Sequence, residues 1–328
     1  MVSALYGAAI NFRNALYEKG VFKSHALGVP VISVGNITVG GTGKTPMVAL
    51  VAGMLLEKGE KVGILTRGYG RKNPKQRVLV SDGERILADA KDAGDEPFEL
   101  ARKLNGKAVI VADADRVSAG IWTREKFGIT TFVLDDAFQH RQVRRDTDIV
   151  LIDATNPFGN GKTLPFGTLR EPLKNLQRAD LIVITRANLI EGVSNLTSQI
   201  KRYNQTSPIH ISRNRISNVT TLKDFQTTNN TEQITKDKVF AFCALGNPNN
   251  FYDQLRQENF EVMATQTFSD HHFYNQKDIA AIENKARSVS AKTLLTTAKD
   301  AVKLRDYEFE LPCSVVEIEM IFDEDFKI

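Results

Sequence analysis

Cysteine, tryptophan and long apolar runs are scarce in this chain. Among its 328 residues are one tryptophan and two cysteines, Cys243 and Cys313. Both cysteines lie in apolar runs far apart, which predicts buried thiols in a reducing compartment and argues against a disulfide framework or a metal-ligand pair. No stretch approaches the roughly 18 to 20 apolar residues that a membrane-spanning helix needs.

An excess of charge of one sign is also missing. Lysine and arginine total 43 and aspartate and glutamate 39, a formal net charge of +4. We therefore expect no nucleic-acid partner, since such proteins carry a clustered basic face. The N-terminus lacks a basic start followed by an uninterrupted apolar segment, so no secretory signal is expected. A hydrophobic share of 42% with 25% charged residues is typical of a globular protein.

Short apolar runs alternate with helical patterns over the first two thirds of the chain. Helix-like stretches follow Thr45 and cover about 96–104, 115–126 and 191–203. The strand-like runs are 29–34, 61–66, 76–81, 108–113, 130–135, 148–153 and 180–185. Nearly continuous apolar strands are typical of a sheet covered on both faces. The alternation predicts an α/β fold with a parallel sheet.

The composition predicts a second domain. Residues 204–236 are polar, with one or two short strands such as 209–213, and the α/β rhythm resumes at 238. The predicted organisation is a P-loop NTPase-like parallel sheet domain and a second, smaller α/β domain, with a cleft between them. The boundaries are an N-terminal amphipathic helix at 1–28, the phosphate-loop domain at 29–205, a polar linker at 206–237 and the smaller domain at 238–328.

The N-terminal segment has an apolar helical face. Leu5, Ala9, Phe12 and Leu16 are spaced by four, three and four residues, and basic residues lie nearby. Such a face packs on its own domain in most proteins. The alternative is a helix lying in a membrane interface, with its basic residues near anionic headgroups. The pattern leaves both open.

Residues 35–46, GNITVGGTGKTP, match most of the phosphate-loop pattern G-x-x-x-x-G-K-[ST]. The first glycine of that pattern is replaced by Thr38. Lys44 is expected to reach the β and γ phosphates, and the Thr45 hydroxyl to bind Mg²⁺. The competing interpretation is a glycine-rich turn with a solvated lysine. The predicted nucleotide-binding residues are Thr38, Val39, Gly40, Gly41, Thr42, Gly43, Lys44 and Thr45.

Acidic residues follow two of the strand-like runs. Asp135 and Asp136 end TTFVLDD, where a phosphate-loop enzyme places its metal-binding acid. Asp153, which ends DIVLID, is a weaker candidate for the same position. Asp95, in GDEP, is either an acidic helix cap or a carboxylate that accepts a proton from an acceptor hydroxyl.

Arginines and histidines offer further candidates. Arg116 and Arg170 are interpreted either as groups that neutralise phosphoryl charge or as ordinary surface residues. His271 and His272 follow Asp270, and adjacent side chains in a strand point apart, so metal binding by this pair is not expected. His140 is expected to pack beneath the two metal acids.

Several of these stretches together resemble one enzyme family. They are VISVGNITVGGTGKTP, TRGYGRK, GDEP, LDDAFQHRQVRRD, FGNGKTLPFGTLREP, FSDHHFY and TTAKDAVKL, and they run in order from about residue 5 to 304. The chain resembles the tetraacyldisaccharide 4′-kinases, the lipid A 4′-kinases of Gram-negative bacteria. Thr38 is a trait of that family, whereas Ala137 stands where many members have glycine.

The resemblance implies a two-domain kinase that binds ATP and Mg²⁺ in the cleft. It implies that Asp95 is the catalytic base, coupled to His271, and that Asp135, Asp136, Arg116 and Arg170 act near the nucleotide or metal. The acceptor would be the 4′-hydroxyl of a tetraacyldisaccharide 1-phosphate, a glycolipid, and the product lipid IVA in lipid A biosynthesis. The N-terminal helix would hold the enzyme peripherally at the cytoplasmic face of the inner membrane.

Two other classes share part of this pattern. A nucleotide-dependent switch or GTPase needs an [NT]-K-x-D signature, and only AKDA at 298–301 approaches it. A non-catalytic module that binds membrane surfaces would explain residues 1–25 but leaves the phosphate loop and the aspartates without a role.

Overall fold

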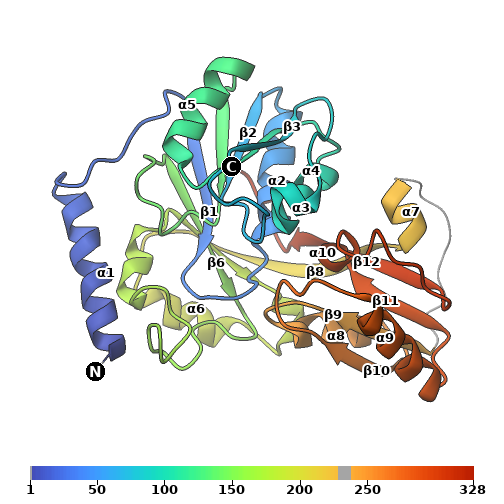
Figure 1. The fold of residues 1–328 in the computed structure, drawn as a ribbon. Helices are drawn as coiled ribbons and strands as arrows, with labels where there is room; N and C mark the ends of the chain where they lie inside the picture. The colour runs from blue at the N-terminus through green and yellow to red at the C-terminus, as the bar shows by residue number, and fades with distance from the viewer. Residues whose placement is uncertain (1, 228–237) are drawn as a thin grey trace. The chain divides into compact units, whose positions relative to one another are not determined.

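The computed structural model describes residues 2–227 and 238–328. It consists of two compact units, each an α/β structure (Figure 1). The first unit comprises Met1–Arg213 and Met320–Ile328, and the second comprises Asn214–Glu319. The predicted fold class, a sheet domain with a second, smaller α/β part, is confirmed.

The first unit is built on a sheet with the strand order β7-β6-β1-β5-β2-β4-β3, and the start of β8 (Ile209–Thr221) pairs with β7. Its strands are β1 (Val31–Asn36), β2 (Val62–Thr66), β3 (Val78–Asp82), β4 (Val109–Ala112), β5 (Thr131–Asp135), β6 (Thr147–Asp153) and β7 (Leu181–Thr185). All neighbours pair in parallel except β3, which is antiparallel to β4. No helix joins β2 to β3, so the chain leaving β2 returns in the opposite direction.

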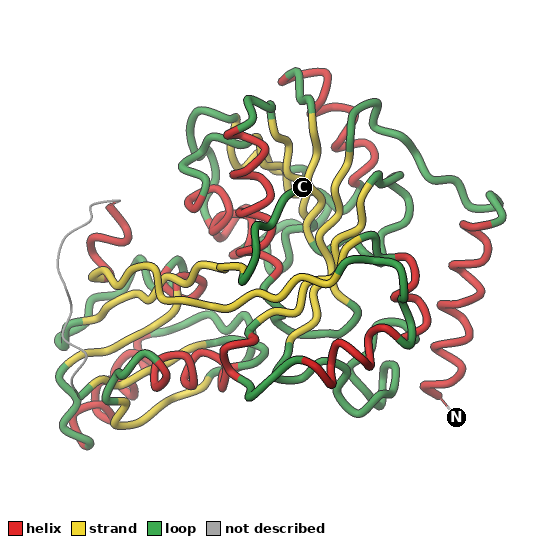
Figure 2. Tube along the Cα trace, turned by 180° about the vertical axis from the view of Figure 1, so that it is seen from behind, coloured by secondary structure: helices red, strands yellow, loops and turns green. Residues whose placement is uncertain are grey.

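Helices cover both faces of this sheet (Figure 2). Ile110 and Ala112 of β4 face a core formed with α2 (Lys44–Glu57) and α4 (Asp95–Lys103). Val109 and Val111, on the opposite face, pack with α5 (Arg116–Phe127). Helix α6 (Ser194–Lys201) packs under β6 and β7. Burial on both faces is the reason that these strands read as continuous apolar runs.

Strand β1 lies between β5 and β6. The chain continues from β1 to one side of the sheet, through β2, β3 and β4, and later to the other side, through β6 and β7. Such a switch point opens a crevice beyond the carboxyl ends of the central strands, where ligands bind in open α/β sheets. The segments that leave β1, β5 and β6 there carry the phosphate loop, the Asp135–Asp136 pair and Asp153.

The second unit has its own parallel sheet, in the order β10-β9-β11-β12. Its strands are β9 (Val239–Cys243), β10 (Val262–Thr267), β11 (Thr293–Thr297) and β12 (Cys313–Phe322), and its helices are α8 (Pro248–Gln257), α9 (Gln276–Ser288) and α10 (Ala298–Ala301). Phe251 and Leu255 of α8 pack on Leu295 of β11 and Val316 of β12. Both cysteines are buried free thiols.

The connection between the units differs from the predicted polar linker. One strand of 13 residues, β8, covers Ile209–Thr221, and α7 (Leu222–Thr227) follows. Only two of its residues are buried, so an apolar strand pattern marks only its start, which the sequence predicts as a short strand at 209–213. The rest of the predicted linker, 228–237, lies outside the described residues. Residues 320–328 were assigned to the smaller domain, but Met320, Phe322 and Phe326 pack on the core of the first unit.

Helix α1 spans Val2–Glu18, which is shorter than the predicted 1–28. It ends because Gly20 adopts a left-handed conformation (φ 72°) and the Val21 amide bonds the Leu16 carbonyl, the arrangement of a Schellman cap. The apolar face of α1 is exposed, with Leu5 at 64% and Phe12 at 68%. Of the two alternatives that the pattern leaves open, packing of this face on its own domain is contradicted by the exposure of these side chains. Short helices α3 (Ala90–Ala93), η1 (Leu173–Arg178) and η2 (Ala187–Leu189) lie in connections.

Gly35 allows the turn after β5 to lie against β1. A Cβ atom at this position would lie 2.6 Å from the Phe138 backbone nitrogen and 2.7 Å from its Cβ. The Ala137 amide also bonds the Val34 carbonyl at 3.2 Å. This close approach brings residues 136–138 next to the strand that leads into the phosphate loop.

We expect Gly35→Ala to lower the free energy of unfolding by about 1–3 kcal/mol, because the added methyl group overpacks the contact with Phe138. The matched control is Gly53→Ala, at an open position in α2 where a Cβ meets nothing within 4 Å. That substitution should raise stability by about 0.5–1 kcal/mol, since alanine is the better helix former. Urea denaturation of both variants checks the pair, and equal stabilities would contradict the packing argument.

Candidate active site

The phosphate loop has the backbone conformation that anion binding requires. Gly40 and Gly43 have φ values of 105° and 88°, which only glycine adopts without strain. Gly43 is the N-cap of α2, and no side chain caps the first turn of this helix. The amides of that turn have no partner within the helix, and with the helix dipole they form an anion-binding end.

Thr38 occupies a position at which glycine is not needed. It forms an antiparallel bridge with Leu169, and its side chain is buried. The Val39 amide bonds the Thr168 carbonyl at 2.8 Å, and the Arg170 amide bonds the Ile37 carbonyl at 2.8 Å. The loop entrance is therefore paired with residues 168–170, and this pairing brings Arg170 beside the phosphate loop.

Asp136 is surrounded by cationic side chains. Arg170 Nη1 donates to both of its carboxylate oxygens, at 2.7 and 2.9 Å, and Lys44 Nζ lies 3.7 Å from Oδ1. Arg116 Nη1 donates to the Asp136 carbonyl at 3.3 Å. Burial acts to raise the pKa of Asp136, but the nearby Lys44 and Arg170 charges outweigh it and hold the pKa below its usual value.

Asp135 has the opposite electrostatic behaviour. It ends β5, is 2% exposed, and accepts a hydrogen bond from the Thr66 hydroxyl at 3.0 Å. Burial raises its pKa to about 7, with further contributions from the Glu96 and Asp136 charges. The two neighbouring aspartates therefore bind protons at different pH, and Asp135 is protonated over much of the acidic range.

Asp95 is a buried helical residue and not the predicted helix cap. The N-cap of α4 is Gly94, which has φ 95° and no Cβ, and Asp95 is the first helical residue. A Cβ on Gly94 would lie 2.6 Å from the Tyr69 carbonyl oxygen, so the helix start is pressed against residues 68–69. The Asp95 side chain is 3% exposed.

His271 belongs to the second unit, in a turn between β10 and α9. Its backbone is left-handed (φ 60°), and its amide bonds Asp270 Oδ1 at 3.0 Å. Lys299 Nζ, from α10, lies 3.3 Å from Asp270 Oδ1 and 3.5 Å from His271 Nε2. An ammonium group only donates, so this contact assigns the acceptor role to Nε2 and leaves Nδ1 as the donor of the ring. Asp95 is in the first unit, so its coupling to His271 stays a prediction.

Three of the alternative candidates can be placed. Asp153 forms an ion pair with Arg186, whereas Lys44 contacts Asp136. His140 is partly buried; burial, with the nearby arginine charges, lowers its pKa to about 4, so the ring is neutral near pH 7. Asp300 of AKDA is fully buried and bonds the Ala244 amide at 3.1 Å, so it is not available to bind a guanine base.

Sequence reasoning missed side chains that support this site. Gln139 and Glu171 lie within the quoted motifs but were assigned no role. Gln139 accepts a hydrogen bond from Arg170 and donates one to Glu171. Thr66 and Lys299 were also missed. Thr66 is the last residue of β2 and Lys299 lies two positions after the end of β11, and this place at a strand end is the sequence signal that points to them.

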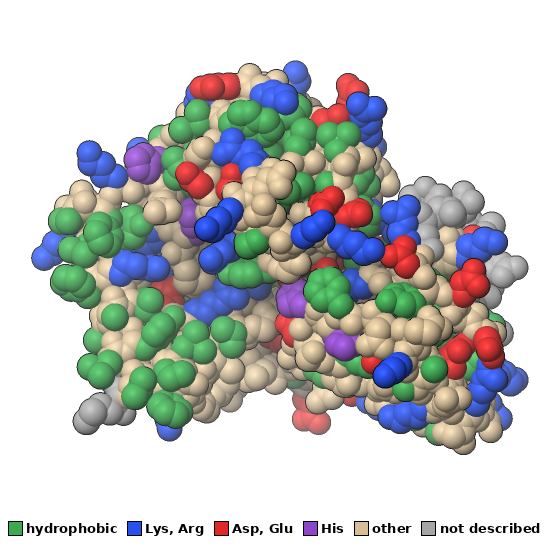
Figure 3. All heavy atoms as spheres, in the orientation of Figure 1, with side chains coloured by type: hydrophobic (Ala, Val, Ile, Leu, Met, Phe, Trp, Pro, Cys, Tyr) green, Lys and Arg blue, Asp and Glu red, His purple; other side chains and the backbone are tan. Residues whose placement is uncertain are grey.

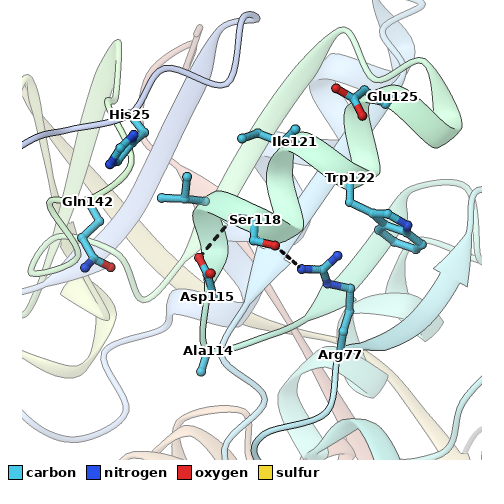
Figure 4. Close-up of a pocket in the computed structure, with 10 residues that line it drawn as sticks. His25, Arg77, Ala114, Asp115, Ser118, Ile121, Trp122, Glu125 and Gln142 are labelled. Carbon is cyan, nitrogen blue, oxygen red and sulfur yellow. Dashed lines mark hydrogen bonds between the residues drawn. The ribbon is translucent and has the colours of Figure 1, made fainter.

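A separate surface pocket of about 920 Å³ lies along α5 in the first unit (Figure 4). Ile121 and Trp122 line it, and Arg77 reaches across to the Ser118 hydroxyl at 2.8 Å. None of the predicted site residues lines this pocket. We therefore assign the candidate active site to the phosphate loop and not to this hollow.

The comparisons with known proteins agree with this assignment. The family model described as tetraacyldisaccharide-1-P 4′-kinase matches residues 1–327. The chain belongs to this family. The tetraacyldisaccharide 4′-kinase of Geobacter metallireducens is 39% identical over 93% of this chain and 87% of its own length. That of Desulfotalea psychrophila is 37% identical over 95% of this chain and 88% of its own length.

A solved structure supports the same relationship. LpxK from Aquifex aeolicus, in its "apo" form in complex with ATP, is 32% identical to this chain, with a TM-score of 0.74. The match covers 98% of this chain and 93% of that chain. The P-loop kinase fold is therefore shared along the whole chain.

The residues at the phosphate loop fit ATP and Mg²⁺. A Cβ added to Gly40 or Gly41 meets nothing within 4 Å, so open space adjoins the loop. The Thr42 hydroxyl is buried without a hydrogen-bond partner in the described part of the chain. Among the described residues no group of three or more His, Cys, Asp or Glu gathers to hold a metal. Nucleotide-bound Mg²⁺ needs only one or two carboxylates besides the phosphates.

We expect asparagine substitutions of the two neighbouring aspartates to change the stability of the metal-free protein in opposite directions. Between the usual aspartate pKa and about 7, folded Asp135 keeps a proton that the unfolded chain has released. The free energy of unfolding therefore falls as pH rises through this window. Asp135→Asn removes that loss, so its stability gain over the natural protein should be larger at about pH 8 than at about pH 5.

Asp136→Asn should instead destabilise the protein at both pH values. The lowered pKa of Asp136 means that its carboxylate contributes stability above the usual aspartate pKa, which is lost only as pH falls through the folded value. Asparagine tolerates the left-handed backbone of this position (φ 49°), so strain does not confuse the comparison. Thermal denaturation in a chelator measures both variants, and effects of the same sign would contradict the assignment.

Proposed function

We propose that this protein transfers the γ-phosphoryl group of ATP to the 4′-hydroxyl of a tetraacyldisaccharide 1-phosphate. The observation that carries this proposal is the phosphate loop with Lys44 beside Asp136, in a chain matched by the family model over residues 1–327. The product is a bisphosphorylated tetraacyl disaccharide, lipid IVA, an intermediate of lipid A biosynthesis.

Charge neutralisation and positioning supply most of the catalysis. Lys44 and the amides at the start of α2 bind the β and γ phosphates, and Arg170 and Arg116 add positive charge around Asp136. Thr45, Asp135 and Asp136 are the residues that would hold Mg²⁺, which would neutralise charge on the phosphate oxygens. A buried Asp135 that is protonated in acid must release its proton to bind the cation. Charged groups that are already in position lower the activation barrier of phosphoryl transfer, because they do not have to reorganise during the reaction.

Asp95 accepts the proton of the acceptor hydroxyl, and His271 supports it. The Nδ1–H of His271 is a donor suited to a carboxylate, since Lys299 occupies the Nε2 side of the ring. A sugar hydroxyl is a poor nucleophile at neutral pH, so a correctly placed base contributes roughly 10²–10⁴-fold to the rate.

Asp95→Asn should lower the rate of phosphoryl transfer by roughly 10²–10⁴-fold, because the amide cannot accept the proton. Binding of ATP should change little, since the substitution leaves the phosphate loop intact. The measurement is transfer from labelled ATP, with Mg²⁺ and a tetraacyldisaccharide 1-phosphate, to a bisphosphorylated product, alongside calorimetric titration of ATP.

Asp92→Asn is the matched control, because Asp92 is an exposed acid on the neighbouring α3. It should keep full activity. Lys44→Ala should lose most ATP-dependent turnover. Full activity of Asp95→Asn would remove Asp95 from the proposed role, and transfer from GTP in preference to ATP would favour a nucleotide-dependent switch.

The enzyme works as a peripheral protein at the cytoplasmic face of the inner membrane. Within the described residues, no helix has both the length and the apolar character needed to cross a bilayer. Figure 3 shows hydrophobic side chains gathered over α1. Val2, Leu5, Phe12 and Phe166 are exposed by 51%, 64%, 68% and 65%. We call these four residues the α1 patch. Such a surface, with lysines nearby, suits an interface of acyl chains and anionic headgroups.

The double substitution Leu5→Glu and Phe12→Glu should weaken binding to anionic lipid vesicles by at least about tenfold. Burial of each side chain contributes roughly 1.5–3 kcal/mol, and about 1.4 kcal/mol corresponds to a tenfold change. Co-sedimentation with vesicles measures the effect. Ile121→Glu is the control, since Ile121 is 39% exposed on α5 and lies outside the α1 patch. Equal binding of the two variants would remove the patch from this role.

A further inference from the structure

Helix α1 is attached to the first unit by polar contacts and small residues. Its two buried residues are Gly7 and Asn14. A Cβ added to Gly7 would lie 3.3 Å from Pro172, which shows how closely the helix approaches that segment. Thr163 donates to the Ser3 carbonyl at 2.6 Å, and Asn175 donates to Asn11 at 3.2 Å. A helix that served only as an apolar anchor would not need such a specific polar face.

The most buried of these contacts ends on Glu171. Asn14 Nδ2 donates to Glu171 Oε2 at 3.2 Å, and the Glu171 side chain is fully buried. Arg178 Nη2 neutralises the carboxylate, at 2.8 Å from Oε1 and 2.7 Å from Oε2. Gln139 Nε2 donates to Oε1 at 2.8 Å. A buried carboxylate that accepts several hydrogen bonds fixes the orientation of each donor.

Gln139 connects Glu171 with Arg170 beside the phosphate loop. Its amide nitrogen donates to Glu171 and to the Asn36 carbonyl, at 2.8 and 2.9 Å. The other end of the amide, Oε1, then faces Arg170 Nη1, at 3.5 Å. Arg170 is also the residue directly before Glu171 in the chain. Its guanidinium group binds both carboxylate oxygens of Asp136.

A second contact between α1 and the same segment runs through the backbone. Arg13 Nη2 donates to the Gln139 carbonyl at 3.1 Å, and Arg141 Nη1 donates to the Asn14 carbonyl at 3.0 Å. Helix α1 therefore holds residues 139–141 from two sides. Those residues begin three positions after Asp136 in the chain.

We infer that Glu171 is a positioning residue that connects Asn14 of α1 with Arg170, so that the docked α1 is required for full phosphoryl transfer as well as for membrane attachment. This inference rests on the proposed kinase function. Arg170 is then positioned by α1, whose opposite side carries the exposed Leu5 and Phe12. The two sides of α1 therefore have separate roles.

The test is Asn14→Leu, which removes the donor to Glu171, keeps the approximate size of the side chain and replaces asparagine with a better helix former. Assays use substrate dispersed in detergent, so that membrane attachment does not limit the rate. We expect kcat to fall by about 10- to 100-fold, the usual effect of losing a group that orients a metal or phosphate ligand. The KM for ATP and binding to anionic vesicles should stay within about twofold of the natural values.

A double-mutant cycle with Arg170→Ala separates positioning from general destabilisation. If Asn14 acts through Arg170, Asn14→Leu should have its full effect in the natural protein and almost none in Arg170→Ala. Independent effects that simply add would overturn the inference. Asn14→Ala is the second variant, should leucine disturb folding. Asn195→Leu is the control for the same chemical change on a helix, since Asn195 is exposed on α6 and its side chain accepts a hydrogen bond from Gln199 of the same helix.

Hydrogen exchange followed by mass spectrometry provides a readout that needs no acceptor. Asn14→Leu should speed amide exchange of residues 136–141 and 168–171, and Asn195→Leu should not. Unchanged exchange in these segments would overturn the inference even if activity fell. If the natural protein did not phosphorylate the disaccharide, the proposed function would fail, whereas the exchange experiment would still decide whether α1 holds the Arg170 segment.

Discussion

The carboxylate of Asp136 joins three segments that are distant in the sequence. Lys44 approaches it from the phosphate loop and Arg170 from the segment paired with that loop, while Arg116 holds the backbone of the same residue. Like charges brought together in a buried site repel each other unless an opposite charge lies between them. Asp136 supplies that charge. It allows three cationic side chains to gather beside the phosphate loop, and its own backbone there is left-handed.

Most strands of the first unit could be predicted from the sequence, because strands that are buried on both faces of a sheet are nearly continuous apolar runs. Strands β1, β2 and β4 to β7 appear as apolar runs, and their predicted ranges differ from the observed ones by at most two residues at either end. The errors lie where that signal is weak. The antiparallel direction of β3 depends on a missing crossover helix, and β8 alternates exposed and partly buried side chains. The return of residues 320–328 to the first unit is a long-range contact that no local pattern encodes.

Local motifs showed which residues gather at the site but not how each behaves. The phosphate loop follows from glycines before Lys44, and the acids follow from a strand that ends in Asp135 and Asp136. The sequence does not show that these aspartates have pKa values shifted in opposite directions, because the shift depends on burial and on arginines from elsewhere in the chain. Glu171 was missed for the same reason: its partners Asn14, Gln139 and Arg178 meet only in the folded protein.

The packing of the last described residues has a consequence for synthesis on the ribosome. Domains generally fold as units while the chain emerges, the N-terminal part first. In this protein, Met320 and the residues after it complete a core whose other members lie before residue 184, and the whole second unit is made in between. Nascent chains that contain the complete phosphate loop thus still expose part of the surface that Met320 later covers. The unit that carries the phosphate loop is therefore the first to emerge, but its core lacks these contacts until residues 320–322 have been made.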